Sequence, residues 1–277
     1  MSLGKNIVTP FGVPGIVGAS DVPDWSFIYT ASAVKDPKYN IGDRVVTGDG
    51  RVFRYAKAGT AGVLSSFGAT VTASSNISVL APAQTTGCGA IGDRKVTITI
   101  ASGDGRAADG VVAADELRGG YIVMGNQSSS AMCRCIVGNT VVASGGGTTI
   151  VTLDGPLTAA VTVGVTYTEI ILNPYAFMET GSGVATNLEY KSFFGVPVVT
   201  ATVGQYFWLQ SWGPIWIVSG GTGTPGDSAF DREVYFVGDG SISGAAHVTQ
   251  ENGYQVAGFI MDSGSTTPPF IMLQVNP

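Results

Sequence analysis

Short runs of β-prone residues, separated by turns rich in glycine, recur along almost the whole chain. The clearest example is residues 44–55, where two such runs flank Gly48–Gly50 and the Asp-Gly pair supplies the positive φ of a tight hairpin turn. Residues 95–100 alternate strictly between polar and apolar side chains, as a strand with one buried face does. Many short strands with turns between them are typical of a sandwich or a barrel. The pattern therefore predicts an all-β fold, an antiparallel sandwich or barrel built of short strands.

The composition excludes two other classes of protein. Charged residues make up 12% and hydrophobic residues 44% of the 277 residues, whereas charged residues make up about 25% of an average soluble chain. A disordered chain would be rich in charge and poor in apolar residues. A coiled coil or helical bundle would need abundant glutamate, lysine, arginine and leucine. Glycine, with 40 residues, takes their place here.

Further strands are expected on both sides of residue 175. The expected strands before it lie near residues 25–29, 119–124, 131–137, 148–153 and 165–172. Those after it lie near residues 195–202, 205–218, 233–237, 254–261 and 269–275, with a strand–turn–strand expected in the second of these. Residues 57–90 are expected to be loop with one or two weak strands, and residues 109–117 are the best candidate for a short helical turn.

Three segments are distinguished along the chain. Residues 1–24 contain three prolines, which remove backbone donors, so we expect an extended N-terminal arm that becomes ordered against a partner or its own domain. A frayed terminus is the alternative. Residues 25–175 form a first β block and residues 176–277 a second. The pattern does not decide between two domains and one continuous β fold.

The charge balance and the apolar pattern bear on partners and location. The formal net charge is −6, whereas direct nucleic-acid binding would need a concentrated lysine and arginine surface. We therefore expect no direct nucleic-acid partner. Glycine and threonine interrupt every apolar stretch, so no membrane span is expected. The first residues lack the apolar core of a secretory signal. Synthesis and folding in the cytoplasm are therefore expected.

Residues typical of catalytic sites are sparse. The chain has one histidine, His247, and no Gly-x-Ser-x-Gly motif accompanies it. A surface or structural histidine is therefore favoured over a general base. We expect no enzyme activity, no catalytic residues, no metal site and no cofactor.

Cys133 and Cys135 are two residues apart, so on a strand their thiols would be neighbours. This is not the two-residue spacing of a zinc half-site, and no second pair completes one. We expect two small buried apolar residues, while a disulfide of either with Cys88 stays open.

Aspartates recur in the glycine-containing turns. They are Asp43, Asp49, Asp93, Asp104, Asp227 and Asp239. None has the dense spacing of a calcium-binding loop, so ordinary turn chemistry is favoured over ion binding. The Gly-Asp-Arg sequence at 42–44 recurs at 92–94, and recurrent turn chemistry is favoured over duplication.

Three tryptophans, Trp208, Trp212 and Trp216, follow one another at spacings of four. Because large aromatic side chains bury much apolar area, a core or a subunit interface is favoured. A sugar-binding platform is the alternative. On a strand the three rings would point the same way only if no bulge intervenes.

Several segments resemble virion-associated structural proteins of tailed bacteriophages. Residues 42–59 resemble a segment recurrent in that group, and residues 173–175, 195–197, 206–214 and 255–260 resemble it in the same order. The Trp-Leu-Gln-x-Trp-Gly-Pro motif at 208–214 is fairly specific. Residues 60–170 depart most from the group.

The resemblance implies a capsid decoration or cement protein, which binds the outer surface of a phage head and stabilises contacts between capsomers. The implied partners are the major capsid protein and further copies of the chain in a homotrimer, and the implied location is the virion. No catalytic residue is carried over. We expect the apolar residues of the arm to bind the partner: Ile7, Val8, Phe11, Val13 and Ile16.

A second class of function stays open. It is a tail-fibre or receptor-binding β module that recognises a host-surface glycan, with the three tryptophans as its site. A polysaccharide depolymerase would need two carboxylates placed across a cleft, and nothing in the sequence singles out such a pair.

Overall fold

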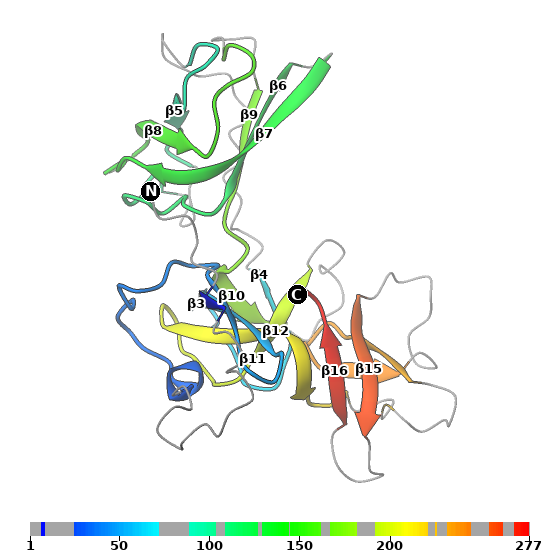
Figure 1. Ribbon diagram of the computed structural model, residues 1–277. Coiled ribbons are helices and arrows are strands. Elements are labelled where there is room, and N and C mark those ends of the chain that lie inside the picture. Colours follow the sequence, from blue (N-terminus) through cyan, green and yellow to red (C-terminus); the bar gives the residue numbers. More distant parts are fainter. Residues whose placement is uncertain are drawn as a thin grey trace, which may run out of the picture. The chain divides into compact units, whose positions relative to one another are not determined.

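The computed structural model describes most of the chain. The described residues are 7–8, 25–71, 89–103, 109–126, 129–143, 145–161, 167–181, 192–220, 225, 232–244, 255–262 and 269–276. Apart from one short 3₁₀ helix, η2 (Ser26–Tyr29), the regular elements in these ranges are strands (Figure 1). The chain is all-β, as predicted.

The chain divides into two compact units. The first unit comprises Met1–Thr72 and Tyr175–Pro277, and the inserted unit comprises Ala73–Pro174. This differs from the expected blocks, 25–175 and 176–277. A boundary near residue 175 is present, but the segment before residue 73 belongs with the C-terminal block, because its strands pair with C-terminal strands.

The inserted unit, green in Figure 1, is built on one antiparallel sheet of five strands in the order β5-β8-β7-β6-β9. Its strands are β5 (Lys95–Ile100), β6 (Tyr121–Asn126), β7 (Ser129–Asn139), β8 (Gly147–Leu153) and β9 (Tyr167–Ile171). The predicted alternation in β5 is confirmed, since Val96, Ile98 and Ile100 are buried. Residues 109–117 form turns and an isolated bridge between Val112 and Val142 in place of the expected helical turn.

The first unit holds one mixed sheet of eleven strands. Its strands are β1 (Ile7–Val8), β2 (Arg44–Val46), β3 (Val52–Ala58), β4 (Ala69–Val71), β10 (Ala176–Thr180), β11 (Phe193–Pro197), β12 (Tyr206–Trp216), β13 (Glu233–Phe236), β14 (Ile242–Gly244), β15 (Val256–Asp262) and β16 (Phe270–Gln274). Their order is β1-β2-β3-β10-β4-β11-β12-β16-β15-β13-β14. Most neighbours are antiparallel, as expected, but β1–β2 and β3–β10 are parallel.

Part of this sheet closes on itself. β3 pairs with β12 as well as with β2 and β10, so β3-β10-β4-β11-β12 is a ring of five strands. A ring of so few strands has an interior that side chains fill. Small residues of β3 and β4, namely Ala56, Ala58 and Ala69, are buried in one cluster with Phe207 and Leu209 of β12. The expected barrel is thus present within the first unit, with mixed strand directions.

The hairpin predicted at residues 44–55 is confirmed. β2 and β3 are antiparallel, and Gly50 in the turn between them has φ +85°. The strand expected at residues 25–29 is wrong, because residues 26–29 form η2. The helical turn places both Ile28 and its neighbour Phe27 against one buried cluster that includes Val45 and Phe53. In a strand, successive side chains would point to opposite faces.

β12 contributes side chains to three hydrophobic clusters formed by the described residues of the first unit. Phe207 and Leu209 lie in the cluster of the five-stranded ring described above, and Ile215 lies in a second cluster with residues of β13, β15 and β16. Trp208 lies in the third, where its ring centroid is 5.1 Å from that of Tyr55 and 4.9 Å from that of Tyr39. The core of the first unit is therefore organised along this strand.

A bulge divides β12 into two halves. The first half pairs with β3 as far as Trp212, the second half pairs with β16 from Trp212 to Trp216, and the register shifts between Gln210 and Trp212. The side-chain amide of Gln210 donates to the carbonyls of Trp212 (3.2 Å) and Pro214 (3.0 Å). The expected strand–turn–strand is therefore one continuous, bulged strand of 11 residues.

Trp208→Ala should lower the free energy of unfolding by about 3–5 kcal/mol, because it empties the centre of a buried aromatic cluster. Trp216→Ala is the matched control and should change it by less than about 1 kcal/mol, because that ring is exposed. Urea unfolding followed by far-ultraviolet circular dichroism measures both. Equal losses in the two variants would contradict the assignment of Trp208 to the core.

Candidate functional site

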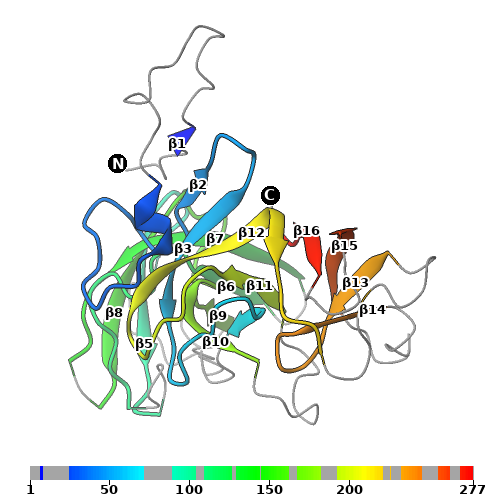
Figure 2. The same cartoon turned by 90° about the horizontal axis from the view of Figure 1, so that it is seen from below.

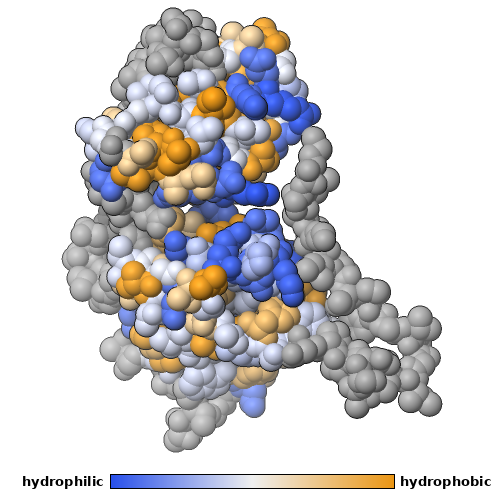
Figure 3. Space-filling model, turned by 90° about the vertical axis from the view of Figure 1, so that its left-hand side faces the viewer, coloured by the Kyte–Doolittle hydropathy of each residue, from blue (hydrophilic) through white to orange (hydrophobic). Residues whose placement is uncertain are grey.

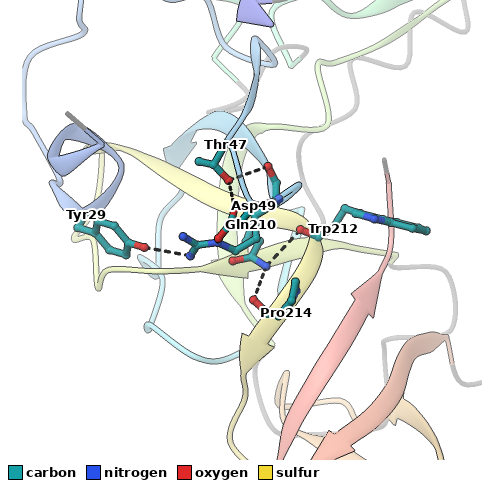
Figure 4. A network of polar contacts seen from close by, with 7 residues as sticks. Tyr29, Thr47, Asp49, Gln210, Trp212 and Pro214 are labelled. Carbon is teal, nitrogen blue, oxygen red and sulfur yellow. Dashed lines mark hydrogen bonds and ion pairs between the residues drawn. The ribbon is translucent and has the colours of Figure 1, made fainter. Parts of the chain in front are cut away.

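The three tryptophans of β12 have three different environments. Trp208 is 2% exposed, Trp212 is half-buried and Trp216 is 45% exposed. The three rings would point the same way only if no bulge separated them, and the bulge of β12 lies between Trp208 and Trp212. Figure 4 shows the side chain of Trp212 pointing away from the polar residues drawn beside it. The three rings form no common platform, and Trp208 is a core residue, as favoured by the sequence.

An exposed apolar surface lies on the sheet of β12, β16 and β15, which run side by side in Figure 2. Trp216 lies opposite Phe270, while Pro214 lies opposite Met272, which in turn lies opposite Phe259. Directly opposite residues share a face of a sheet. We call these five residues the apolar face.

The exposure of its aromatic residues distinguishes the apolar face. Trp216, Phe270 and Phe259 are each 40–45% exposed, whereas Ile215 and Ile271, on the other side of the same strands, are buried. Scattered exposed apolar residues are ordinary, and Figure 3 shows separate apolar groups among polar residues on the side in view. Adjoining aromatic residues on neighbouring strands are less ordinary, and they make the apolar face a candidate binding surface.

A pocket of about 360 Å³ adjoins the apolar face, and we call it the β12 pocket. Its lining residues come from η2, the 44–55 hairpin, β11, β12 and β16, and from the loop positions Ser66 and Val198, all within the first unit. They are Tyr29, Asp49, Arg51, Ser66, Pro197, Val198, Gln210, Pro214, Ile215, Trp216 and Phe270. Trp216 is the one tryptophan of the predicted three that lines it.

A network of polar side chains forms one wall of the pocket (Figure 4). The Nε of Arg51 donates to Oδ2 of Asp49 at 2.7 Å, and its Nη1 donates to the hydroxyl of Tyr29 at 3.0 Å. The hydroxyl of Thr47 donates to Oδ1 of Asp49. The hairpin turn thus holds a carboxylate and a guanidinium side by side at the edge of the pocket.

The ionisation of both charged groups is reinforced by these contacts. Partial burial by itself would raise the pKa of Asp49, but hydrogen bonds from Thr47 and Arg51 outweigh it, so the pKa lies below its ordinary value. Burial would likewise lower the pKa of Arg51, but the contacts with Tyr29 and Asp49 raise it. The pair is therefore ionised at neutral pH and has no net charge.

Gly213 allows the hairpin to approach β12 closely. A Cβ at this position would lie 2.9 Å from Cγ and 3.0 Å from Cα of Arg51, and its φ of +101° disfavours other residues. The close contact with Arg51 and the positive φ thus explain the glycine of the Trp-Gly-Pro motif.

The expected burial of the cysteine pair is wrong for Cys133. Cys133 is exposed and Cys135 half-buried on β7, and both are free thiols. Burial, then the charge of Asp154 and the neighbouring Cys133, raise the pKa of Cys135. A neutral thiol is a poor nucleophile, so this position offers little reactivity. Cys88, like His247, lies outside the described residues.

The described aspartates act in turns, as favoured. Asp43 and Asp93 each accept a hydrogen bond at 2.8 Å from the backbone N–H three residues earlier, and Asp239 accepts one from Ser241. The recurrent Gly-Asp-Arg sequence therefore forms the same turn in both units. Because the two units differ in strand order, this agrees with recurrent turn chemistry and not with duplication. Asp104 and Asp227 lie outside the described residues. In the described part of the chain, no three His, Cys, Asp or Glu side chains gather to hold a metal ion.

The N-terminal arm is described at two residues. Ile7 and Val8 form β1, which pairs in parallel with Val45 and Val46 of β2. The other predicted partner-binding residues, Phe11, Val13 and Ile16, lie outside the described residues.

No protein-family model matches the chain, and comparison with the curated proteins and with the solved structures gives no match. No helix among the described residues is long and apolar enough to cross a membrane.

Asp49→Asn should lower the melting temperature at neutral pH, and this effect should shrink as the pH falls. The depressed pKa of Asp49 stabilises the fold above the unfolded value of about 3.9, and this stabilisation is lost as the pH falls through the folded value. The effect is small because the carboxylate is partly exposed. Differential scanning fluorimetry between roughly pH 7 and pH 3 measures the difference from the wild type. A melting-temperature difference between the variant and the wild type that does not change with pH would contradict this prediction.

Proposed function

We propose that this chain is a structural protein of a tailed-bacteriophage particle. It binds the outer surface of the capsid, contacts the major capsid protein and stabilises contacts between capsomers. It acts by binding and not as an enzyme. The resemblance of residues 42–59 and 206–214 to virion-associated proteins supports the assignment to a particle, and the apolar face supports the binding role.

The apolar face is the observation that carries this proposal. It presents Trp216, Phe270 and Phe259 on adjacent strands, and tryptophan is among the residues that dominate the energies of protein interfaces. With charged residues at 12% of the chain, apolar contact contributes more here than long-range charge attraction. An apolar sheet face suits a partner with an apolar surface of its own, such as a capsid protein.

The arm supplies a second contact. The start of the arm is anchored on the first unit, because β1 pairs in parallel with β2. In this proposal the remaining predicted partner-binding residues of the arm, Phe11, Val13 and Ile16, bind a neighbouring subunit. Copies arranged as a homotrimer at a local three-fold axis bind through several such contacts at once, and avidity multiplies weak individual affinities.

A cryo-electron microscopy map of the intact particle tests the assignment directly. We expect density for both β units in regular copies over the capsid lattice. Density confined to the tail or its fibres would contradict the capsid role and would favour host recognition.

Phe259→Ser should weaken attachment to particles that lack the protein by roughly tenfold or more, because it removes one of the three exposed aromatic rings of the face. Val203→Ser is the matched control, since Val203 is 63% exposed outside the face, and it should bind as the wild type does. Co-sedimentation over a range of protein concentrations measures both affinities. Equal binding of the two variants would rule out the face as the docking surface.

Deletion of residues 1–24 should abolish stable attachment while both β units stay folded. The reason is that the arm is proposed to add its own contact with a neighbouring subunit. Circular dichroism checks the fold, and gel densitometry of purified particles measures the number of bound copies. Unchanged occupancy would overturn the role of the arm and leave that of the apolar face standing.

A further inference from the structure

The β12 pocket brings aromatic rings and hydrogen-bonding groups to the same place. Trp216 and Phe270 are exposed, lie directly opposite each other on β12 and β16, and both line the pocket. Tyr29, Asp49 and Arg51 line it as well. Its volume of about 360 Å³ falls in the range of small-ligand sites, about 300–1,000 Å³. We propose that this pocket binds a neutral sugar ring of a glycan.

The aromatic residues suit the apolar side of such a ring. A pyranose presents C–H groups on its faces and hydroxyl groups around its rim. An exposed indole or phenyl ring buries apolar area against such a face, and the C–H groups meet the negative face of the π system. Trp216 and Phe270, held on paired strands, offer this surface without rearrangement of the backbone.

The polar wall suits the hydroxyl groups of the rim. A carboxylate has about four acceptor positions, and hydrogen bonds from Thr47 and from the backbone N–H and Nε of Arg51 use three of those of Asp49. A guanidinium has five N–H groups, and the bonds to Asp49 and Tyr29 use two of those of Arg51. An acceptor and several donors thus lie side by side, as adjacent sugar hydroxyls require.

The charge balance selects a neutral ligand. Arg51 is neutralised by Asp49 at 2.7 Å, and the other polar lining residues, Tyr29, Ser66 and Gln210, are uncharged. A phosphate or a carboxylate in the pocket would meet the negative charge of Asp49 with no unpaired cation among the lining residues to offset it. An uncharged hydroxylated ligand meets no such repulsion.

The polar groups are held in place before any ligand arrives. The amide of Gln210 is fixed by two backbone carbonyls, and Arg51 packs against Gly213 where a Cβ would clash. Ser66 has a φ of +66° and is held by its N–H, which donates to the carbonyl of Pro197. Such preorganisation lowers the entropy cost of binding.

This inference goes beyond the proposed particle role and does not depend on it. The pocket and the apolar face share Pro214, Trp216 and Phe270, so variants of these three residues cannot test one proposal independently of the other. Phe259 belongs to the face alone, whereas Tyr29, Asp49 and Arg51 belong to the pocket alone. Variants of these residues therefore distinguish a failure of one proposal from a failure of the other.

Saturation-transfer difference NMR of the full chain tests the sugar site. The probes are the neutral disaccharides cellobiose, maltose and N,N′-diacetylchitobiose, with glucuronic acid as the acidic comparison. We expect at least one disaccharide to receive saturation on its ring C–H protons, and glucuronic acid to receive at least fivefold less. Trp216→Ala should abolish the transfer, and Tyr29→Phe should weaken it at least threefold.

Phe259→Ala is the matched control, because it removes an aromatic ring of similar exposure outside the pocket, and it should leave the transfer unchanged. Circular dichroism confirms that each variant is folded. Three results would overturn the proposal: no transfer to any of the disaccharides, transfer that survives Trp216→Ala, or equal transfer to glucuronic acid. Loss of transfer in Phe259→Ala would also overturn it, since the sugar would then lie on the open face.

Discussion

A single strand, β12, has to satisfy two different neighbours. Its first half completes the five-stranded ring by pairing with β3, and its second half begins the sheet of β16, β15, β13 and β14. A strand can change partners in this way only where its ladder is interrupted, and the bulge between Gln210 and Trp212 is that interruption. The Gln210 amide then donates to the two carbonyls that the lost neighbour leaves open. The three hydrophobic clusters formed by the described residues of the first unit depend on this arrangement, because β12 contributes side chains to each.

The candidate site is a consequence of the same change of partner. The pairing of β3 with β12 ends at the Val52–Trp212 pair, and the preceding residue, Arg51, packs closely against Gly213. The pocket beside this contact is lined by the hairpin, which supplies its polar wall, and by β12 and β16, which supply its aromatic wall. The apolar face lies on the part of β12 that pairs with β16.

Both proposed surfaces fit a chain with little charge. The apolar face offers contact area, and the β12 pocket offers hydrogen bonds around a neutralised ion pair. Neither depends on a strong electrostatic field, which a chain with 12% charged residues does not have. Binding through many modest contacts is the mode that a repeated, symmetric particle component can use, because its copies act together.

Local patterns in the sequence determined the all-β class, the 44–55 hairpin and the strand at 95–100, because alternation and turn residues act over a few neighbouring positions. They also identified Trp208 and Trp216, but not that one is core and the other exposed. That difference depends on a bulge, and one residue of slip reverses the direction of every side chain that follows. Only the tertiary structure decided that Asp49 and Arg51 meet Trp216 and Phe270, since no local pattern specifies which distant strands pair. The sequence thus determined the strands, and long-range pairing decided the units, the apolar face and the pocket.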